Sequence, residues 1–129
     1  MDTSALERLD TFPYLHRVSE LMTAPLVCLP ADADIGRAAR LMSERHVSSV
    51  IVLDGEGRAA GILTERDVLR ILAERREAAG VASVASAMSS PVHTIEADAL
   101  IYRALARMAR LRLRHLPVAD ATGRAIGML

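Results

Sequence analysis

Aromatic residues are nearly absent from this sequence, which has no tryptophan, one phenylalanine and two tyrosines in 129 residues. Proteins that bind single-stranded nucleic acid usually stack the bases on aromatic side chains, and this chain has almost none to offer. Sixteen basic residues balance sixteen acidic ones, so no net charge attracts nucleic acid or an anionic membrane surface. We therefore expect no nucleic acid partner.

The chain also lacks the features of secreted and membrane proteins. Cys28 is the single cysteine, which excludes a disulfide within the chain and suits a reducing compartment. No apolar run approaches the length of about 18 residues that a membrane span needs. The N-terminal residues lack the basic and apolar regions of a signal peptide. These absences predict a cytoplasmic protein that does not enter a membrane.

Patterns that support catalysis are missing too. The sequence has no paired carboxylates, no nucleophile with a base and no phosphate loop of the Gly-x-x-x-x-Gly-Lys type. His16, His46 and His93 are scattered without the spacing of metal ligands. We therefore expect no enzyme activity, no catalytic residues, no metal site and no required cofactor.

The residues that are present predict an α/β fold. About half of the chain is hydrophobic and consists mainly of small aliphatic residues, which suit close packing of helices on a sheet. Apolar periodicity and turn residues predict a mixed order of helices and strands. The expected elements are helix 14–22, strand 26–29, helix 35–45, strand 48–53, strand 58–63 and helix 65–79.

An internal repeat organises these elements. With an offset of 66 residues, one register without gaps pairs Met22 with Met88 and runs through to Gly61 and Gly127. A long shared register with matched turns implies two copies of one supersecondary unit. Further pairs are Pro25 with Pro91, Asp32 with Asp98, Ile35 with Ile101, Arg37 with Arg103, Met42 with Met108, Val52 with Val118, Asp54 with Asp120, Gly57 with Gly123, and Arg58 with Arg124.

The repeat sets the predicted domain boundaries. Residues 1–13 form an N-terminal tail, residues 14–79 the first repeat, residues 80–83 a linker and residues 84–129 the second repeat. Each repeat follows the order helix, strand, helix, strand, strand, helix. We expect the two repeats to pack about a pseudo-twofold axis, because neither alone buries much core.

In this register the second copy stops early. Leu63 corresponds to Leu129, the last residue, so the second repeat lacks its closing helix. We expect the chain to be a fragment of a longer polypeptide, with a naturally asymmetric pair as the alternative.

The stretch Gly61–Asp67 carries the clearest chemistry. An apolar strand ends at Leu63, and Thr64 is a favourable N-cap for the helix that follows. The first N–H groups of a helix are unpaired and its dipole is positive there, so such a junction favours an anion such as phosphate. Thr64 and Asp67 share the first turn, where one side chain can bind phosphate and the other can accept hydrogen bonds from ribose.

Together, the repeat and this junction resemble a CBS domain pair, also called a Bateman module. The resemblance covers about residues 14–129. It rests on the repeated, ordered set of motifs, since each single motif is weak. The motifs are Met22-Thr23-Ala24-Pro25, Asp54-Gly55-Glu56-Gly57-Arg58, Gly61-Ile62-Leu63-Thr64-Glu65-Arg66-Asp67, Met88-Ser89-Ser90-Pro91 and Arg114-His115-Leu116-Pro117-Val118-Ala119-Asp120.

The resemblance implies a regulatory module that senses AMP, ADP, ATP or S-adenosylmethionine in the cleft between the repeats. It implies that phosphate and ribose bind Thr64 and Asp67, with help from Arg66. It also implies a homodimer formed through helices and an attached or partner effector domain. The remaining implied ligand residues are Val27, Cys28 and Leu29, whose backbone holds adenine, Ile62 as an apolar wall, and Arg114 and His115 near the phosphates.

Each candidate residue also has a purely structural interpretation. Asp67 can stabilise the helix dipole, and Thr64 can be an ordinary N-cap. Arg66, Arg114 and His115 can be solvated, and Cys28 can be a small buried hydrophobe. Two alternatives for the whole chain therefore stay open: a dimerisation module without a ligand, and the regulatory part of a nucleotide-processing enzyme.

Overall fold

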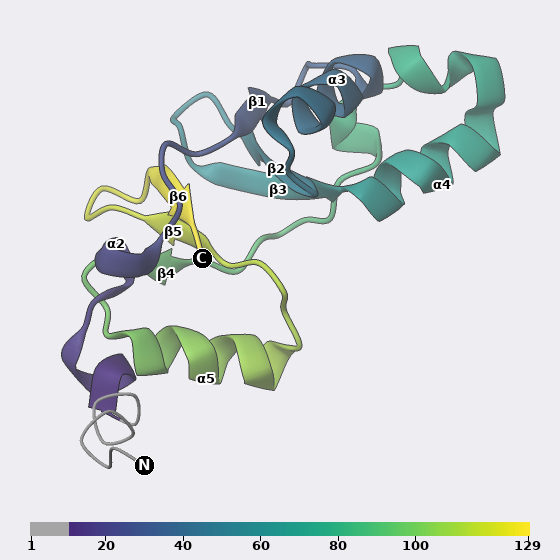
Figure 1. Ribbon diagram of the computed structural model, residues 1–129. Helices are drawn as coiled ribbons and strands as arrows, with labels where there is room; N and C mark the ends of the chain where they lie inside the picture. The colour runs from purple at the N-terminus through teal and green to yellow at the C-terminus, as the bar shows by residue number, and fades with distance from the viewer. Residues whose placement is uncertain (1–10) are drawn as a thin grey trace. The chain divides into compact units, whose positions relative to one another are not determined.

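A computed structural model describes residues 11–129. Most of the predicted N-terminal tail, residues 1–10, lies outside the described residues. The rest is an α/β fold that divides into two compact units, each built on a three-stranded mixed sheet (Figure 1). One unit is Leu26–Val92, and the other combines the chain up to Pro25 with His93–Leu129.

The unit Leu26–Val92 contains a sheet of order β1-β2-β3, with β1 parallel to β2 and β2 antiparallel to β3. Four of the five residues of β2 are buried, as predicted for a strand covered on both faces. In chain order the elements are β1 Cys28–Pro30, α3 Ile35–Arg45, β2 Ser49–Leu53, β3 Ala59–Thr64, α4 Glu65–Arg75 and the 3₁₀ helices η1 Arg76–Val81 and η2 Val84–Ser86.

Helix α3 has the predicted bounds because both of its ends carry local signals. Asp34 is the N-cap and its Oδ1 accepts the Arg37 N–H at 2.8 Å. The helix ends at His46, which adopts the left-handed conformation with φ 54°. Its apolar stripe, which includes Ala38 and Met42, is buried in the core of this unit.

Helix α4 and the predicted linker both differ from the sequence prediction. Helix α4 ends at Arg75 instead of residue 79, because Arg76 has φ 50° and the chain continues as η1. The predicted linker 80–83 is packed within the unit. The Ile35 N–H donates to the Ala82 carbonyl and the Val84 N–H donates to the Ala33 carbonyl, both at 2.8 Å.

The second unit has a sheet of order β4-β5-β6 with the same parallel and antiparallel pairings. In its core, Val18 from the N-terminal segment packs with Ile95, Leu116 and Val118 from the C-terminal half. The predicted helix 14–22 is broken into a helical stretch at residues 11–15 and α2. The elements are α2 Val18–Leu21, β4 Ile95–Glu96, α5 Ile101–Leu111, β5 Pro117–Ala119 and β6 Ala125–Met128.

Segments at the start of each sequence repeat pair with the last strand of a sheet. Thr23 pairs with Met128 of β6, and Ser89 pairs with Ile62 of β3. Hence the segment around Thr23 belongs to the unit that contains the second sequence copy, and the segment around Ser89 belongs to the unit that contains most of the first. The predicted repeat boundaries describe similarity along the chain, whereas the packing units exchange these segments.

Candidate functional site

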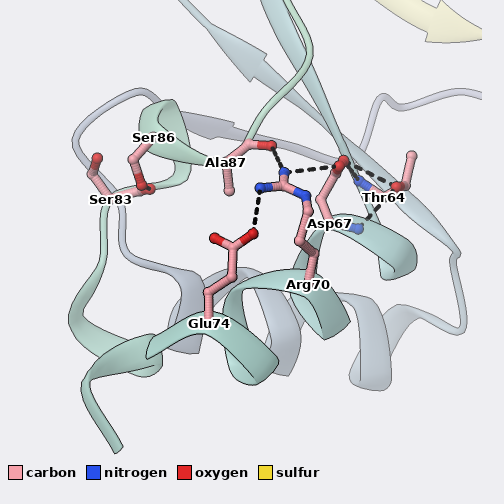
Figure 2. Close-up of polar contacts among 7 residues, drawn as sticks. All are labelled: Thr64, Asp67, Arg70, Glu74, Ser83, Ser86 and Ala87. Atoms are coloured by element: carbon pink, nitrogen blue, oxygen red, sulfur yellow. Dashed lines mark hydrogen bonds and ion pairs between the residues drawn. The ribbon is translucent and has the colours of Figure 1, made fainter. Parts of the chain in front are cut away.

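The candidate site lies where β3 ends and α4 begins. Thr64 is the N-cap of α4, as the sequence predicted, and its hydroxyl oxygen accepts the Asp67 N–H at 3.3 Å. In return, Asp67 Oδ2 accepts the Thr64 N–H at 2.8 Å and the Thr64 hydroxyl at 3.0 Å (Figure 2). This reciprocal pairing is a capping box, which here has aspartate at the third helical position.

The two oxygens of the Asp67 carboxylate have different contacts. Oδ2 is occupied by Thr64, whereas Oδ1 has only a long contact of 3.4 Å with Arg70 Nη2. The Asp67 side chain is 14% exposed. The carboxylate is therefore largely buried and held in one orientation, with Oδ1 as the acceptor that remains for a hydroxyl donor.

The first turn of α4 also has a free amide. The Glu65 N–H donates to the Ser48 carbonyl at 3.0 Å and the Asp67 N–H donates to Thr64. The Arg66 N–H has no hydrogen-bond acceptor in the part of the chain that the structure describes. The Arg66 side chain is exposed, so both groups are accessible to an anion at the positive end of the helix.

Arg70 is a functional candidate that the sequence reasoning missed. Its Nη2 contacts Asp67 Oδ1 and also donates to the Ala87 carbonyl at 3.0 Å, while Nη1 lies 3.9 Å from Glu74 Oε1 (Figure 2). A local signal was present, because Arg70 follows Asp67 by three residues and faces it on the helix. The contact with Ala87 is long-range and has no sequence signal.

Ile62 has a neighbouring segment on each side of β3. It lies opposite Ile51 in the sheet, and on its other side it exchanges two hydrogen bonds with Ser89, at 3.0 and 2.9 Å. Its side chain is half-buried, which suits the predicted role as an apolar wall.

The predicted adenine-binding strand lies in the same sheet as the junction. Cys28 aligns with Ile51, which aligns with Ile62, so Cys28 and Ile62 occupy one cross-strand row. β1 is the edge strand, and the Val27 carbonyl accepts the Ile51 N–H at 3.1 Å. Leu29 is buried in the core, so its side chain is not available to a ligand.

A hollow of about 230 Å³ lies between this edge strand and α3. The free Cys28 thiol at its wall is half-buried. The hollow is lined by Cys28, Leu29, Arg37, Arg40, Leu41 and Glu44.

Arg114 and His115 belong to the other compact unit, where they precede β5. Arg114 is exposed and His115 is half-buried. The structure thus brings together Thr64, Asp67 and Ile62 and places the first strand in their sheet. The contribution of Arg114 and His115 stays a prediction.

Two further properties of residues 11–129 concern metal ligands and membrane spans. No three side chains of histidine, cysteine, aspartate or glutamate in this range gather closely enough to hold a metal ion. None of the described helices has the length and apolar character needed to cross a membrane.

Comparison with known proteins gives consistent matches. The pattern of the CBS domain matches twice, at residues 18–74 and 81–129. A CBS domain protein from Pyrobaculum aerophilum, solved in complex with AMP, is 28% identical with a TM-score of 0.78, covering 88% of this chain and 86% of that one. A CBS-domain-containing protein from Agrobacterium tumefaciens is also 28% identical with a TM-score of 0.73, covering 88% and 92%.

Curated relatives vary in length. An uncharacterized 17.7 kDa protein from Acidianus ambivalens is 28% identical over 113 residues, which are 88% of this chain and 67% of that protein. The chain spans 45% of an uncharacterized protein from Methanopyrus kandleri and 23% of a homoserine O-acetyltransferase from Methanococcus vannielii. Similar sequences thus occur both in small uncharacterized proteins and within larger enzymes.

Proposed function

The chain belongs to the CBS domain family, and we propose that it is a non-catalytic regulatory module that binds an adenine nucleotide at the β3–α4 junction. The observation that carries this proposal is the geometry of Asp67. Its carboxylate is largely buried and oriented by Thr64, and Oδ1 remains available as an acceptor. The relative solved with AMP, at 28% identity, supports the choice of ligand class.

The proposed division of roles follows the chemistry of each group. The diol of a ribose donates to the Asp67 carboxylate, because charged acceptors make the stronger hydrogen bonds. The phosphate binds at the start of α4, where the Arg66 N–H and guanidinium provide donors and positive charge. The adenine ring lies along the backbone of residues 27–29 with Ile62 as its apolar wall. Arg114 and His115 complete the phosphate site in this proposal.

Calorimetric titration with AMP, ADP, ATP and S-adenosylmethionine tests the proposal. We expect at least one of them to bind the native chain, and Asp67→Ala to weaken that binding by about tenfold or more, as for the loss of a hydrogen bond to a charged group. Asp34→Ala is the matched control. It removes an aspartate that accepts a hydrogen bond from the first turn of α3 and that is not one of the proposed ligand residues, so it should leave the affinity unchanged.

Two results would contradict the proposal. One is the absence of heat with all four ligands. The other is an Asp67→Ala variant that binds as tightly as the native chain. Thermal unfolding of both variants, measured alongside, separates lost binding from lost folding.

A role in self-association is supported by a different observation. A hollow of about 340 Å³ lies beside the exposed residues of α3 and α4, and Leu69 on α4 is 66% exposed. We propose that these helices form the surface of a homodimer, because large exposed apolar side chains beside a hollow suit a protein interface. Sedimentation of the chain without nucleotide decides whether association needs a ligand. The hollow is lined by Ala39, Met42, Ser43, Val47, Glu65, Val68 and Leu69.

A further inference from the structure

Arg70 joins two parts of the unit that are separate in sequence. Its Nη2 lies 3.4 Å from Asp67 Oδ1 and 3.0 Å from the Ala87 carbonyl oxygen (Figure 2). We propose that Arg70 is a positioning residue that couples ligand binding at Asp67 to the return segment, defined here as residues 84–90. The ligand step of this proposal rests on the proposed function, whereas the tether between Arg70 and Ala87 does not.

The return segment is held on β3 by its own contacts. Ser89 exchanges two backbone hydrogen bonds with Ile62, and the Ser90 hydroxyl donates to the Ala60 carbonyl at 2.9 Å. Met88 covers Gly61 so closely that a Cβ at this glycine would lie 2.2 Å from the Met88 sulfur. These contacts fix the part of the segment that follows residue 87.

The preceding part of the segment is held by the hydrogen bond from the Val84 N–H to the Ala33 carbonyl, by the burial of Val84 and Ala87, and by the hydrogen bond from Arg70. The Ala87 and Met88 N–H groups both donate to the Val84 carbonyl, at 3.1 and 2.9 Å, which keeps these bonds within the segment itself. Arg70 is the side chain of α4 that ties this turn to the helix, through the Ala87 carbonyl. Loss of the guanidinium should therefore loosen the turn while the Ser89–Ile62 pair persists.

Binding at Asp67 changes how firmly Arg70 is held. The Arg70 side chain is 46% exposed, so part of its rotamer freedom remains in the free protein. A ligand bound at Asp67 Oδ1 shields the contact between Oδ1 and Nη2 from water and so strengthens it. The restrained Nη2 then makes a more persistent hydrogen bond to Ala87. Ordering of a long side chain in this way couples two positions without a large movement.

The return segment lies in the chain just before the second unit resumes, which suits a role in regulation. It leads along the chain to His93, the first residue of the second stretch of the other compact unit. A ligand-dependent change in its stability therefore acts on the connection between the two units. Such coupling requires that the return segment exist in a more ordered and a less ordered state, and that the ligand favour one of them.

Amide hydrogen exchange on the full chain, with and without AMP, tests the proposal. In the free native protein the Ala87, Met88 and Ser89 amides should be protected. Arg70→Gln should raise the exchange rate of the Ala87 and Met88 amides by about fivefold, as for the loss of one hydrogen bond, and leave that of Ser89 unchanged. With AMP, the native chain should gain protection at residues 86–89. Arg70→Gln should still bind AMP and gain protection at Thr64–Asp67, but not at residues 86–89.

Arg75→Gln is the matched control, because it removes a guanidinium from the last turn of α4 with no described contact to the return segment. It should behave as the native chain does. Unchanged exchange at Ala87 and Met88 in free Arg70→Gln would overturn the tether. AMP-induced protection at 86–89 that survives in Arg70→Gln would overturn the coupling. If AMP does not bind the native chain, the coupling to AMP fails, and calorimetry with all four ligands decides the proposed function separately. The measurement on the free protein still tests the tether.

Discussion

At the residue scale, the Thr64–Asp67 pair has a structural role in the chain without any ligand. The pair satisfies the Asp67 and Thr64 amides and leaves one carboxylate oxygen for other donors. The structural and ligand-binding interpretations of these residues are therefore compatible. A ligand would find Asp67 already oriented, which lowers the entropic cost of binding.

Thr64→Ala should destabilise the unit Leu26–Val92 by about 1 kcal/mol, the usual cost of losing an N-cap. Thr64→Ser should keep most of the stability, because serine retains the hydroxyl that both donates to and accepts from Asp67. Urea unfolding of the three proteins measures the difference. Equal stability of the alanine variant and the native chain would show that the capping box contributes nothing.

The sequence predicted this residue pair only in part. Thr64 was identifiable as an N-cap because a hydroxyl residue stood between an apolar strand and a helical pattern, and the structure confirms it. The hydrogen bond that the Thr64 N–H donates to Asp67 Oδ2 was not predicted. The spacing of three residues could have linked Arg70 to Asp67 but not to Ala87, which is brought to α4 by tertiary packing.

At the element scale, the two repeats contain the same strand-connecting turn. Asp54 Oδ1 accepts the Glu56 and Arg58 N–H groups at 2.8 and 3.0 Å. Asp120 Oδ1 accepts the corresponding Thr122 and Arg124 N–H groups at 2.9 and 3.1 Å. In each turn a glycine adopts positive φ, 81° at position 57 and 88° at position 123, where other residues are strained. The shared register thus correctly predicted two equivalent turns.

These turns make stability depend on pH in the acidic range. Hydrogen bonds from the Arg58 and Glu56 N–H groups hold the pKa of Asp54 below its ordinary value of 3.8. A depressed pKa in the folded state stabilises the protein above the unfolded value, and this stabilisation is lost as the pH falls through the folded pKa. The side-chain hydrogen bond from Thr122 has the same effect on the pKa of Asp120.

Asp54→Asn should therefore weaken the pH dependence. Urea unfolding midpoints measured from neutral pH down to about pH 2 should fall less steeply below pH 3.8 in this variant than in the native chain. Asparagine keeps a side-chain oxygen for the turn but cannot be protonated in this range. Identical slopes for the two proteins would contradict the assignment.

The ends of elements were predicted less well than their cores. Helix α3 matched because an aspartate caps its start and a left-handed residue closes its end. Helix α4 ended four residues early, at Arg75, although residues 76–79 include no proline. Arg76 with φ 50° turns the chain into η1, whose Ala79 is fully buried in the core of the unit. Burial of Ala79 in the core therefore outweighed the helix propensity of residues 76–79.

At the scale of the whole molecule, the internal repeat predicted the fold but not which segments pack together. Matched positions such as Met22 and Met88 reveal that two copies exist. They do not reveal that Thr23 pairs with Met128 and Ser89 with Ile62. Similarity between two copies is equally compatible with packing within one copy and with exchange between copies, so only the structure distinguishes them.

The exchanged segments have the same packing in both units. A Cβ at Gly127 would lie 2.8 Å from the Met22 sulfur, and a Cβ at Gly61 would lie 2.2 Å from the Met88 sulfur. The paired glycines of the repeat therefore make room for the paired methionines. This agreement explains in physical terms why both residue types recur at the same offset in the sequence.

The central claim is that an adenine nucleotide binds at the junction of β3 and α4, beside the first strand. Backbone amide NMR of the native chain during separate titrations with AMP, ADP, ATP and S-adenosylmethionine tests this location most directly. For at least one of them, we predict saturable shifts that occur together at Thr64–Asp67 and at residues 27–29. Saturable shifts confined to other parts of the chain, or no shifts with any of the four, would contradict the account.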